Sequence, residues 1–184
     1  MAIKTFTTGE VLTASDTNTF LANAGLVYVT STTVGSAVSS VTVSNCFSST
    51  YDNYQIVYSG IVATASTTFT LKLGSTTTGY YFNLLYSIYG GATSAGLVQQ
   101  NQAAFTYSGV VAPNGSGGTM DLYAPFLATR TGVRATYLEY VTAGATGQFT
   151  GFLDNATSYT GFTLTPTGQT ITGGTITVYG YRKA

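Results

Sequence analysis

Hydrophobic and polar residues alternate along the chain from residue 26 onward. The alternation is most regular at residues 54–59, 68–73 and 176–179. A period of two is typical of a β-strand that turns one face toward a core. Gly, Asn, Pro and Ser interrupt the pattern at the spacing expected of turns between short strands. We therefore predict strands at residues 26–31, 36–44, 53–62, 67–73, 80–89, 97–107 in broken form, 118–124, 134–142, 147–153, 159–165 and 174–182.

This number and length of strands predicts an all-β fold over residues 26–184, an antiparallel β-sandwich of jelly-roll type. Residues 80–86 read Tyr-Tyr-Phe-Asn-Leu-Leu-Tyr and are apolar at both odd and even positions. We expect this strand to be buried on both faces or covered by another subunit. Residues 112–118 hold the densest cluster of turn-forming residues, which predicts an exposed tip.

Residues 1–25 differ from the rest of the chain. Residues 2–6 alternate as a short extended arm would, and Gly9 ends the alternation. Thr13 and Asp16 have the spacing of a capping box, which predicts one short helix that stops at Gly25. Such a helix is too short to be stable alone, so it must pack on the sandwich, on a neighbouring copy or on another protein. The apolar side chains available for that contact are Ile3, Phe6, Val11, Leu12, Phe20 and Leu21.

Composition supports the all-β assignment and removes several classes of function. The 184 residues include 22 Gly, 15 Tyr and 10 Phe, and Thr and the aromatic residues favour strands. Only 7% of residues are charged and the net charge is zero, which gives no electrostatic basis for binding nucleic acid or a membrane surface. The absence of His rules out His-based metal sites and nucleophile systems within one subunit.

The single cysteine and the lack of long apolar runs bear on the cellular compartment in which the protein is made. Cys46 is alone, so it forms no intrachain disulfide, and we expect it to be a small buried hydrophobe. No run of apolar residues is long enough to predict a membrane span, and no basic and apolar leader predicts secretion. We expect the protein to be made in a cytoplasm.

The acidic residues are the remaining candidates for catalysis or metal binding. A glycosidase needs two carboxylates that face one sugar. Asp121 and Glu139 alternate with apolar neighbours, so we expect both at outward strand positions, and Asp154 belongs to a turn. Asp52 and Asn53 could bind calcium with a loop carbonyl, but their place before a strand favours a turn. We therefore expect no enzyme activity, no metal and no cofactor.

Arg130 and Arg134 lie between two predicted strands in a chain with few charges. One interpretation is an intersubunit bond to Glu139 or Asp121, because the guanidinium fork matches a carboxylate. The alternative is a solvated hairpin turn. Leu84, inside the doubly apolar segment, is a further candidate for an intersubunit contact.

Several tyrosines cluster in the strand predicted at residues 80–89. They could stack on sugars, but most tyrosines at strand spacing are core or interface residues whose hydroxyl reaches a partner. The clustered residues are Tyr80, Tyr81, Tyr86 and Tyr89.

Four segments of the chain carry a family resemblance. They are AIKTF at residues 2–6, EVLTASDTNTFL at 10–21, FSSTYDNY at 47–54 and GGTITVYGYR at 173–182. Together they resemble small β-sandwich structural proteins of tailed bacteriophages, a group that includes capsid decoration or cement proteins, minor tail proteins and tail-fibre proteins. The resemblance implies a homotrimeric virion protein on the surface of the capsid or tail. Residues 1–25 would then dock it onto other virion proteins, such as major capsid or tail proteins.

The chain has no shaft of repeats or coiled coil between its first residues and the predicted sandwich. A compact domain of this size has a radius of gyration of about 15 Å, so it projects only a short distance from its attachment point. This favours a capsid decoration knob or a short tail adaptor. The alternative is a tail-fibre or tail-tip module that binds host glycans, with Tyr81 and Tyr89 as the contact residues.

Overall fold

The computed structural model describes residues 7–16, 25–91 and 94–183, and most of them belong to two antiparallel β-sheets. The larger sheet has nine strands in the order β1-β13-β3-β8-β9-β10-β5-β6, with β12 paired to β3 beside this path. Its strands are β1 (Leu26–Thr33), β3 (Asn53–Ala63), β5 (Tyr80–Ile88), β6 (Ser94–Gln102), β8 (Ser116–Tyr123), β9 (Thr131–Glu139), β10 (Ala145–Leu153), β12 (Ile171–Thr172) and β13 (Thr175–Tyr181).

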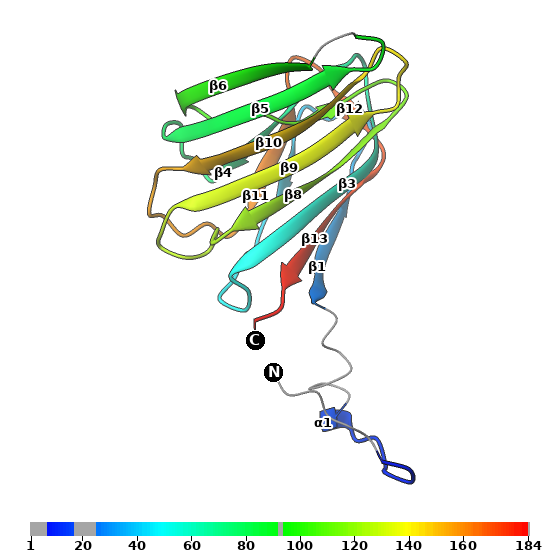
Figure 1. The fold of residues 1–184 in the computed structure, drawn as a ribbon, viewed down its shortest axis with the longest axis vertical. Helices are drawn as coiled ribbons and strands as arrows, with labels where there is room; N and C mark the ends of the chain where they lie inside the picture. The colour runs from blue at the N-terminus through cyan, green and yellow to red at the C-terminus, as the bar shows by residue number, and fades with distance from the viewer. Residues whose placement is uncertain (1–6, 17–24, 92–93, 184) are drawn as a thin grey trace.

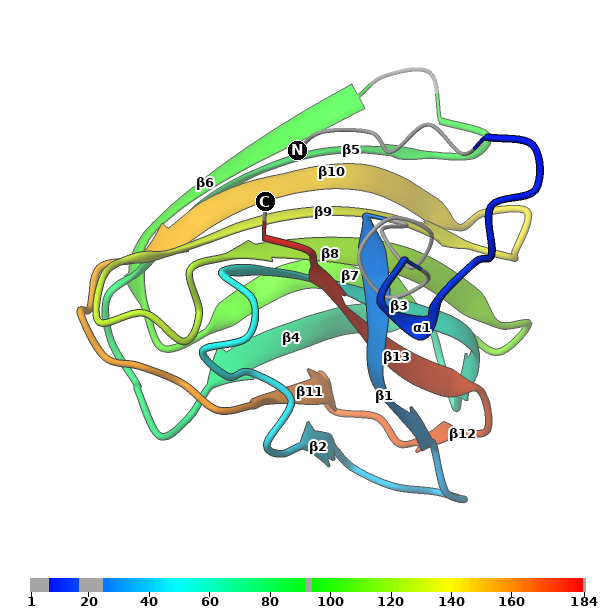
Figure 2. The ribbon, with the colours of Figure 1, turned by 90° about the horizontal axis from the view of Figure 1, so that it is seen from below.

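The smaller sheet has four strands in the order β2-β11-β4-β7. Figure 1 shows the larger sheet in front of the smaller one, and Figure 2 shows the two sheets as separate layers. The chain crosses repeatedly between the layers, as in Greek-key and jelly-roll sandwiches. The predicted all-β sandwich is confirmed. The strands of the smaller sheet are β2 (Val41–Val43), β4 (Thr67–Leu73), β7 (Phe105–Val111) and β11 (Phe162–Pro166).

The core between the sheets is rich in aromatic residues. Phe105 of β7 packs edge-on against Tyr80 and Phe149 of the larger sheet, with ring centroids 4.7 and 5.6 Å apart. The buried tyrosines hydrogen-bond to backbone: the Tyr58 hydroxyl lies 3.3 Å from the Val110 carbonyl oxygen. The expectation that tyrosines at strand spacing fill the core is confirmed for these residues.

Cys46 is also buried, as expected. Burial raises the pKa of its thiol to about 12, with a smaller opposing effect from a backbone hydrogen bond. The thiol is therefore protonated at neutral pH, and it behaves as a small hydrophobe.

The N-terminal segment contains α1 (Ala14–Asp16), whose start is the predicted capping box. The Asp16 backbone N–H donates to the Thr13 hydroxyl at 3.1 Å, and the Thr13 N–H donates back to the Asp16 carboxylate at 3.1 Å. Val11 and Leu12 are exposed, at 79% and 51%. The predicted continuation of the helix, and the docking candidates Ile3, Phe6, Phe20 and Leu21, lie outside the described residues.

Two local predictions need correction. The strand at residues 80–86 is buried on one face only within the chain: Leu84 is 4% exposed and its neighbour Leu85 is 65% exposed. Burial on both faces is therefore wrong for a single copy, and cover by another subunit stays a prediction. The segment 112–118 is not an exposed tip, because only Pro113 and Asn114 are exposed and β8 already begins at Ser116. The buried Ser116 hydroxyl donates to the Ile61 carbonyl oxygen at 3.1 Å, which draws this segment into the sheet.

Candidate binding site

The antiparallel register arranges side chains on the outer face of the larger sheet into two neighbouring rows. The first, the aromatic row, crosses β8, β9, β10 and β5. The second, the polar row, lies two residues along each of these strands and also includes β3. The aromatic row consists of Tyr123, Gly132, Phe152 and Tyr81, and the polar row of Gln55, Asp121, Arg134, Thr150 and Asn83.

Asp121 is the centre of the charged part of the polar row, and only 7% of the residue is exposed. Its Oδ1 accepts hydrogen bonds from the Tyr181 hydroxyl at 2.7 Å and from Gln55 Nε2 at 3.1 Å, and its Oδ2 accepts one from Arg134 Nη2 at 2.9 Å. Burial acts to raise the pKa of this carboxyl, but the three hydrogen bonds and the Arg134 charge outweigh it, so the pKa is lowered. Asp121 is therefore charged at neutral pH, and both of its carboxylate oxygens already accept hydrogen bonds from neighbouring side chains.

Glu139 differs from Asp121 in its orientation, since it points to the opposite face of the sheet. It lies opposite Ser116 in the register, on the inner face, and its Oε2 accepts the Ala145 N–H at 2.7 Å. Burial raises its pKa, and hydrogen bonds from the Ala145 N–H and the Ser66 side chain oppose this only in part. The prediction of outward strand positions is confirmed for Asp121, which lies on the outer face but is covered by its partners, and it is wrong for Glu139, which faces inward. Because the two carboxylates lie on opposite faces, they cannot flank one substrate.

The two arginines bond to carboxylates of their own chain. Arg134 pairs with Asp121, and Arg130 Nε lies 2.6 Å from Asp154 Oδ1. Leu84, the other residue considered for an intersubunit contact, lies in the core of its own chain. The exposed leucine of this strand is the next residue, Leu85.

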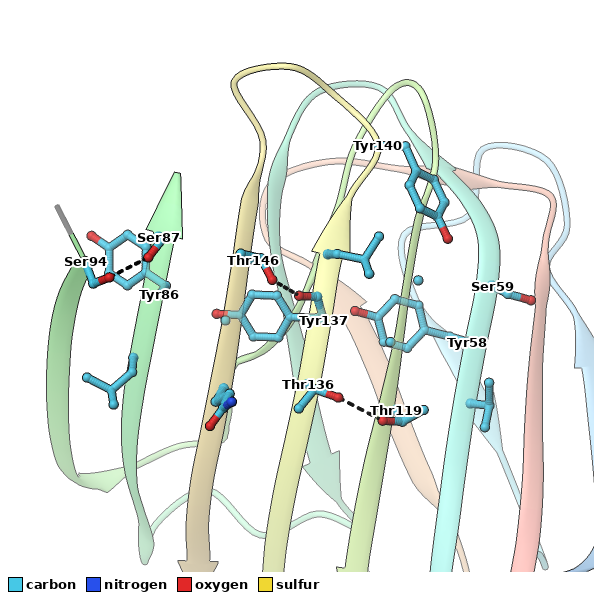
Figure 3. Close-up of a pocket in the computed structure, with 17 residues that line it drawn as sticks. Tyr58, Ser59, Tyr86, Ser87, Ser94, Thr119, Thr136, Tyr137, Tyr140 and Thr146 are labelled. Carbon is cyan, nitrogen blue, oxygen red and sulfur yellow. Dashed lines mark hydrogen bonds between the residues drawn. The ribbon is translucent and has the colours of Figure 1, made fainter. Parts of the chain in front are cut away.

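A hollow of about 700 Å³ lies on the outer face beside Tyr140, and we call it the Tyr140 hollow (Figure 3). Its serine and threonine hydroxyls bond within the protein: the oxygens of Thr119 and Thr136 are 3.0 Å apart, and those of Ser87 and Ser94 are 2.6 Å apart. Leu85, Leu138 and Tyr140 are exposed in it, and no charged residue lines it. The lining residues are Val57, Tyr58, Ser59, Leu85, Tyr86, Ser87, Ser94, Gly117, Gly118, Thr119, Thr136, Tyr137, Leu138, Tyr140, Thr146, Gly147 and Gln148.

Two of the glycines that line the Tyr140 hollow have tyrosine rings behind the sheet that leave no room for a side chain there. A Cβ atom on Gly118 would lie 2.7 Å from the Tyr58 hydroxyl oxygen, and one on Gly147 would lie 2.6 Å from that of Tyr137. Figure 3 shows Tyr58 on β3 and Tyr137 on β9, on either side of β8. A larger residue at either glycine would therefore displace the tyrosine ring behind it.

A second hollow, of about 400 Å³, lies where the aromatic and polar rows meet β6, and we call it the Phe152 hollow. The Phe152 and Tyr81 rings are stacked beside it, with centroids 5.2 Å apart and planes inclined by 9°. Phe152 is 42% exposed. The lining residues are Tyr81, Phe82, Asn83, Val98, Gln99, Gln100, Thr150, Gly151 and Phe152.

Of the two tyrosines predicted as glycan contacts, Tyr81 lines the Phe152 hollow and Tyr89 does not. Tyr89 follows the far end of β5, eight residues away, which corresponds to about 26 Å along a strand. Sequence reasoning missed Phe152 and Asn83. A signal for Phe152 existed: it lies three positions after the buried Phe149, so it must point to the other face of the strand.

The described residues contain no group of three or more Cys, Asp or Glu side chains placed to hold a metal ion. Within the same part of the chain, no helix is long and apolar enough to cross a membrane. The chain matches no protein-family model, and no curated protein is significantly similar to it.

Proposed function

We propose that this protein is a non-enzymatic structural component of a bacteriophage virion, a homotrimeric capsid decoration knob or short tail adaptor that attaches through residues 1–25. The observation that carries the proposal is the N-terminal segment, which exposes Val11 and Leu12 ahead of the sandwich. Exposed large apolar side chains on a short segment fit a contact with another protein. The resemblance of residues 2–6 and 10–21 to phage virion proteins identifies the kind of partner.

The chemistry of the sandwich supports a structural role. Its charged side chains are few, and those at the outer face of the larger sheet are bound to one another, as in the Asp121 and Arg134 pair. A chain with so few titrating groups keeps its stability over a wide pH range, which suits a particle exposed to changing surroundings.

The Tyr140 hollow is the surface that we propose for the contact between copies. Leu85, Leu138 and Tyr140 are exposed there. A second copy can cover the hollow at little desolvation cost, because its serine and threonine hydroxyls already bond within the chain and no charge lines it. The adjacent strand β6 is a sheet edge without charged residues or proline, so it lacks the usual protection against pairing with another chain.

Leu138→Asp tests the trimer contact by placing a charge in the Tyr140 hollow. We expect analytical ultracentrifugation at micromolar concentration to show trimers of the unaltered protein and monomers of the variant. Leu127→Asp is a matched control, because Leu127 is equally exposed, at 40% against 38%, but lies in the loop after β8. A monomeric unaltered protein would refute the trimer.

The attachment is tested by Val11→Asp combined with Leu12→Asp. Both side chains are exposed in the isolated protein, so the double variant should keep the stability of the sandwich. We expect it to be lost from purified virions, whereas Thr8→Asp, at an exposed polar position of the same segment, should be incorporated normally. Normal incorporation of the double variant would overturn the docking role.

A further inference from the structure

The Phe152 hollow has a flat aromatic platform at its margin. The Phe152 ring is held parallel to the Tyr81 ring, which fixes its orientation, and nearly half of it is open to solvent. Pyranose rings present a face of C–H groups that packs on an exposed aromatic ring, because the C–H groups are slightly positive and the ring face is negative. The platform therefore fits a sugar ring.

Two polar side chains of the Phe152 hollow are unused within the described part of the chain. Asn83 and Thr150, which share the outer face with Phe152, make no side-chain hydrogen bond to any described residue. This contrasts with the Tyr140 hollow, where Thr119 and Thr136 satisfy each other. Side-chain amides carry both donors and acceptors, as sugar hydroxyls do. The Phe152 hollow thus offers unused hydrogen-bonding groups beside an apolar platform, the combination typical of small-molecule sites.

The lining of the hollow also defines the charge of its ligand. No lining residue is charged. The nearest charges in the polar row belong to Asp121 and Arg134, which are bonded to each other at 2.9 Å. We propose that the Phe152 hollow binds a neutral saccharide, which stacks on Phe152 and hydrogen-bonds to Asn83 and Thr150. This proposal goes beyond a structural role in the virion and does not depend on it.

The aromatic row extends the platform beyond one sugar. Tyr123 lies two strands from Phe152, with Gly132 between them. Because Gly132 has no side chain, the Tyr123 ring lies over it, with Cδ2 3.3 Å from the place a Cβ would occupy. Tyr123 is itself exposed, so a second sugar ring of the same chain can contact it. We therefore expect an oligosaccharide to bind more tightly than a monosaccharide.

The experiment uses the full chain and a defined panel of neutral tetrasaccharides built from glucose, galactose, mannose or N-acetylglucosamine. Saturation-transfer NMR identifies binding, and isothermal titration gives the Kd. We expect at least one neutral tetrasaccharide to bind with a millimolar or lower Kd. Sialyllactose and a galacturonic acid oligomer serve as charged probes, and we expect them to bind more weakly. Binding of none of the neutral probes, or tighter binding of the charged ones, would overturn the proposal.

Variants then locate the site. Phe152→Ala should weaken binding by about tenfold or more, and Asn83→Ala by a smaller factor, whereas Phe152→Tyr should retain it. Tyr28→Ala removes an exposed aromatic ring of β1 that lines neither hollow, and it should leave the Kd unchanged. If Phe152→Ala binds as well as the unaltered protein, or if Tyr28→Ala abolishes binding, the site lies elsewhere and the proposal is wrong. Circular dichroism of each variant confirms that it is folded.

Discussion

Two phenylalanines on β10, Phe149 and Phe152, provide a sharp test of the two-layered structure. Phe149 is fully buried, with its ring 5.0 Å from that of Phe82 and 5.6 Å from that of Phe105. Phe152 lies on the outer face and has the Tyr81 ring as its aromatic neighbour. The same substitution, Phe to Ala, therefore removes a core ring at one position and a surface ring at the other.

The expected magnitudes differ severalfold. Phe149→Ala should lower the free energy of unfolding by about 3–5 kcal/mol, because it removes buried area and leaves a cavity. Phe152→Ala loses the stacking contact with Tyr81 and a smaller buried area than Phe149→Ala, because Phe152 is 42% exposed, so about 1 kcal/mol is expected. Against a total stability of about 5–15 kcal/mol, the first change is large and the second is minor.

Urea unfolding followed by far-ultraviolet circular dichroism measures both changes. The chain has no tryptophan, so the backbone signal is the more suitable probe. We expect the midpoint for Phe149→Ala to fall by roughly 1–2 M urea, and that for Phe152→Ala by less than about 0.5 M. Equal losses at the two positions, or a loss below about 1 kcal/mol for Phe149→Ala, would refute the assignment of the two faces.

Three further predictions concern the buried carboxyls and a core glycine. Because the pKa of Asp121 is lowered, its carboxylate stabilises the fold fully at any pH above the ordinary pKa of 3.8, and this contribution is lost as the pH falls through the lowered pKa. Asp121→Asn should therefore unfold at a lower urea concentration at pH 7, and its urea midpoint should change less than that of the unaltered protein across the acidic range. The pKa of Glu139 is raised, so its charged form destabilises the fold at neutral pH. Glu139→Gln, which can still accept the Ala145 N–H, should be at least as stable as the unaltered protein at pH 7, and this advantage should vanish as the pH falls toward 4.5. A clear loss of stability at pH 7 would contradict this. Gly118→Ala should cost about 1–3 kcal/mol in thermal or urea unfolding because its Cβ would collide with the buried Tyr58 hydroxyl, whereas Gly96→Ala, whose Cβ has room, should be nearly neutral.

Local patterns were sufficient to predict most of the strands and the helix start. The exceptions are residues 36–44, of which only β2 is a strand, and residues 97–107, which contain the end of β6 and the start of β7. The alternation at residues 54–59 and 176–179 places Ile56 and Val178 in the core, since one face of each strand is buried and the other is polar. The Thr13 and Asp16 capping box depends only on residues three positions apart, so it too could be predicted. Both features are encoded within a few residues of sequence.

The burial of Asp121 could not be predicted in this way, because its partners are distant in sequence. Tyr181 follows it by 60 residues and reaches it from β13, across the intervening strand β3. Only the strand order places these side chains together. The same holds for the Phe152 hollow, which Val98 of β6 and Phe152 of β10 line together. At residues 80–86 the pattern itself misled, because the outward Tyr81 and Leu85 are as apolar as the inward Leu84.

Quantitative mass spectrometry of purified virions tests the central claim most directly. Virions are produced in cells that supply either the full chain or residues 26–184, and the copy number is scaled to the major capsid protein. We expect the full chain at a multiple of three copies per particle, and residues 26–184 to be folded but absent from the particle. A capsid knob would be present in hundreds of copies and a tail adaptor in about a dozen or fewer, because a shell offers many threefold positions and a tail few. Absence of the full chain from virions, or equal incorporation of residues 26–184, would contradict the account.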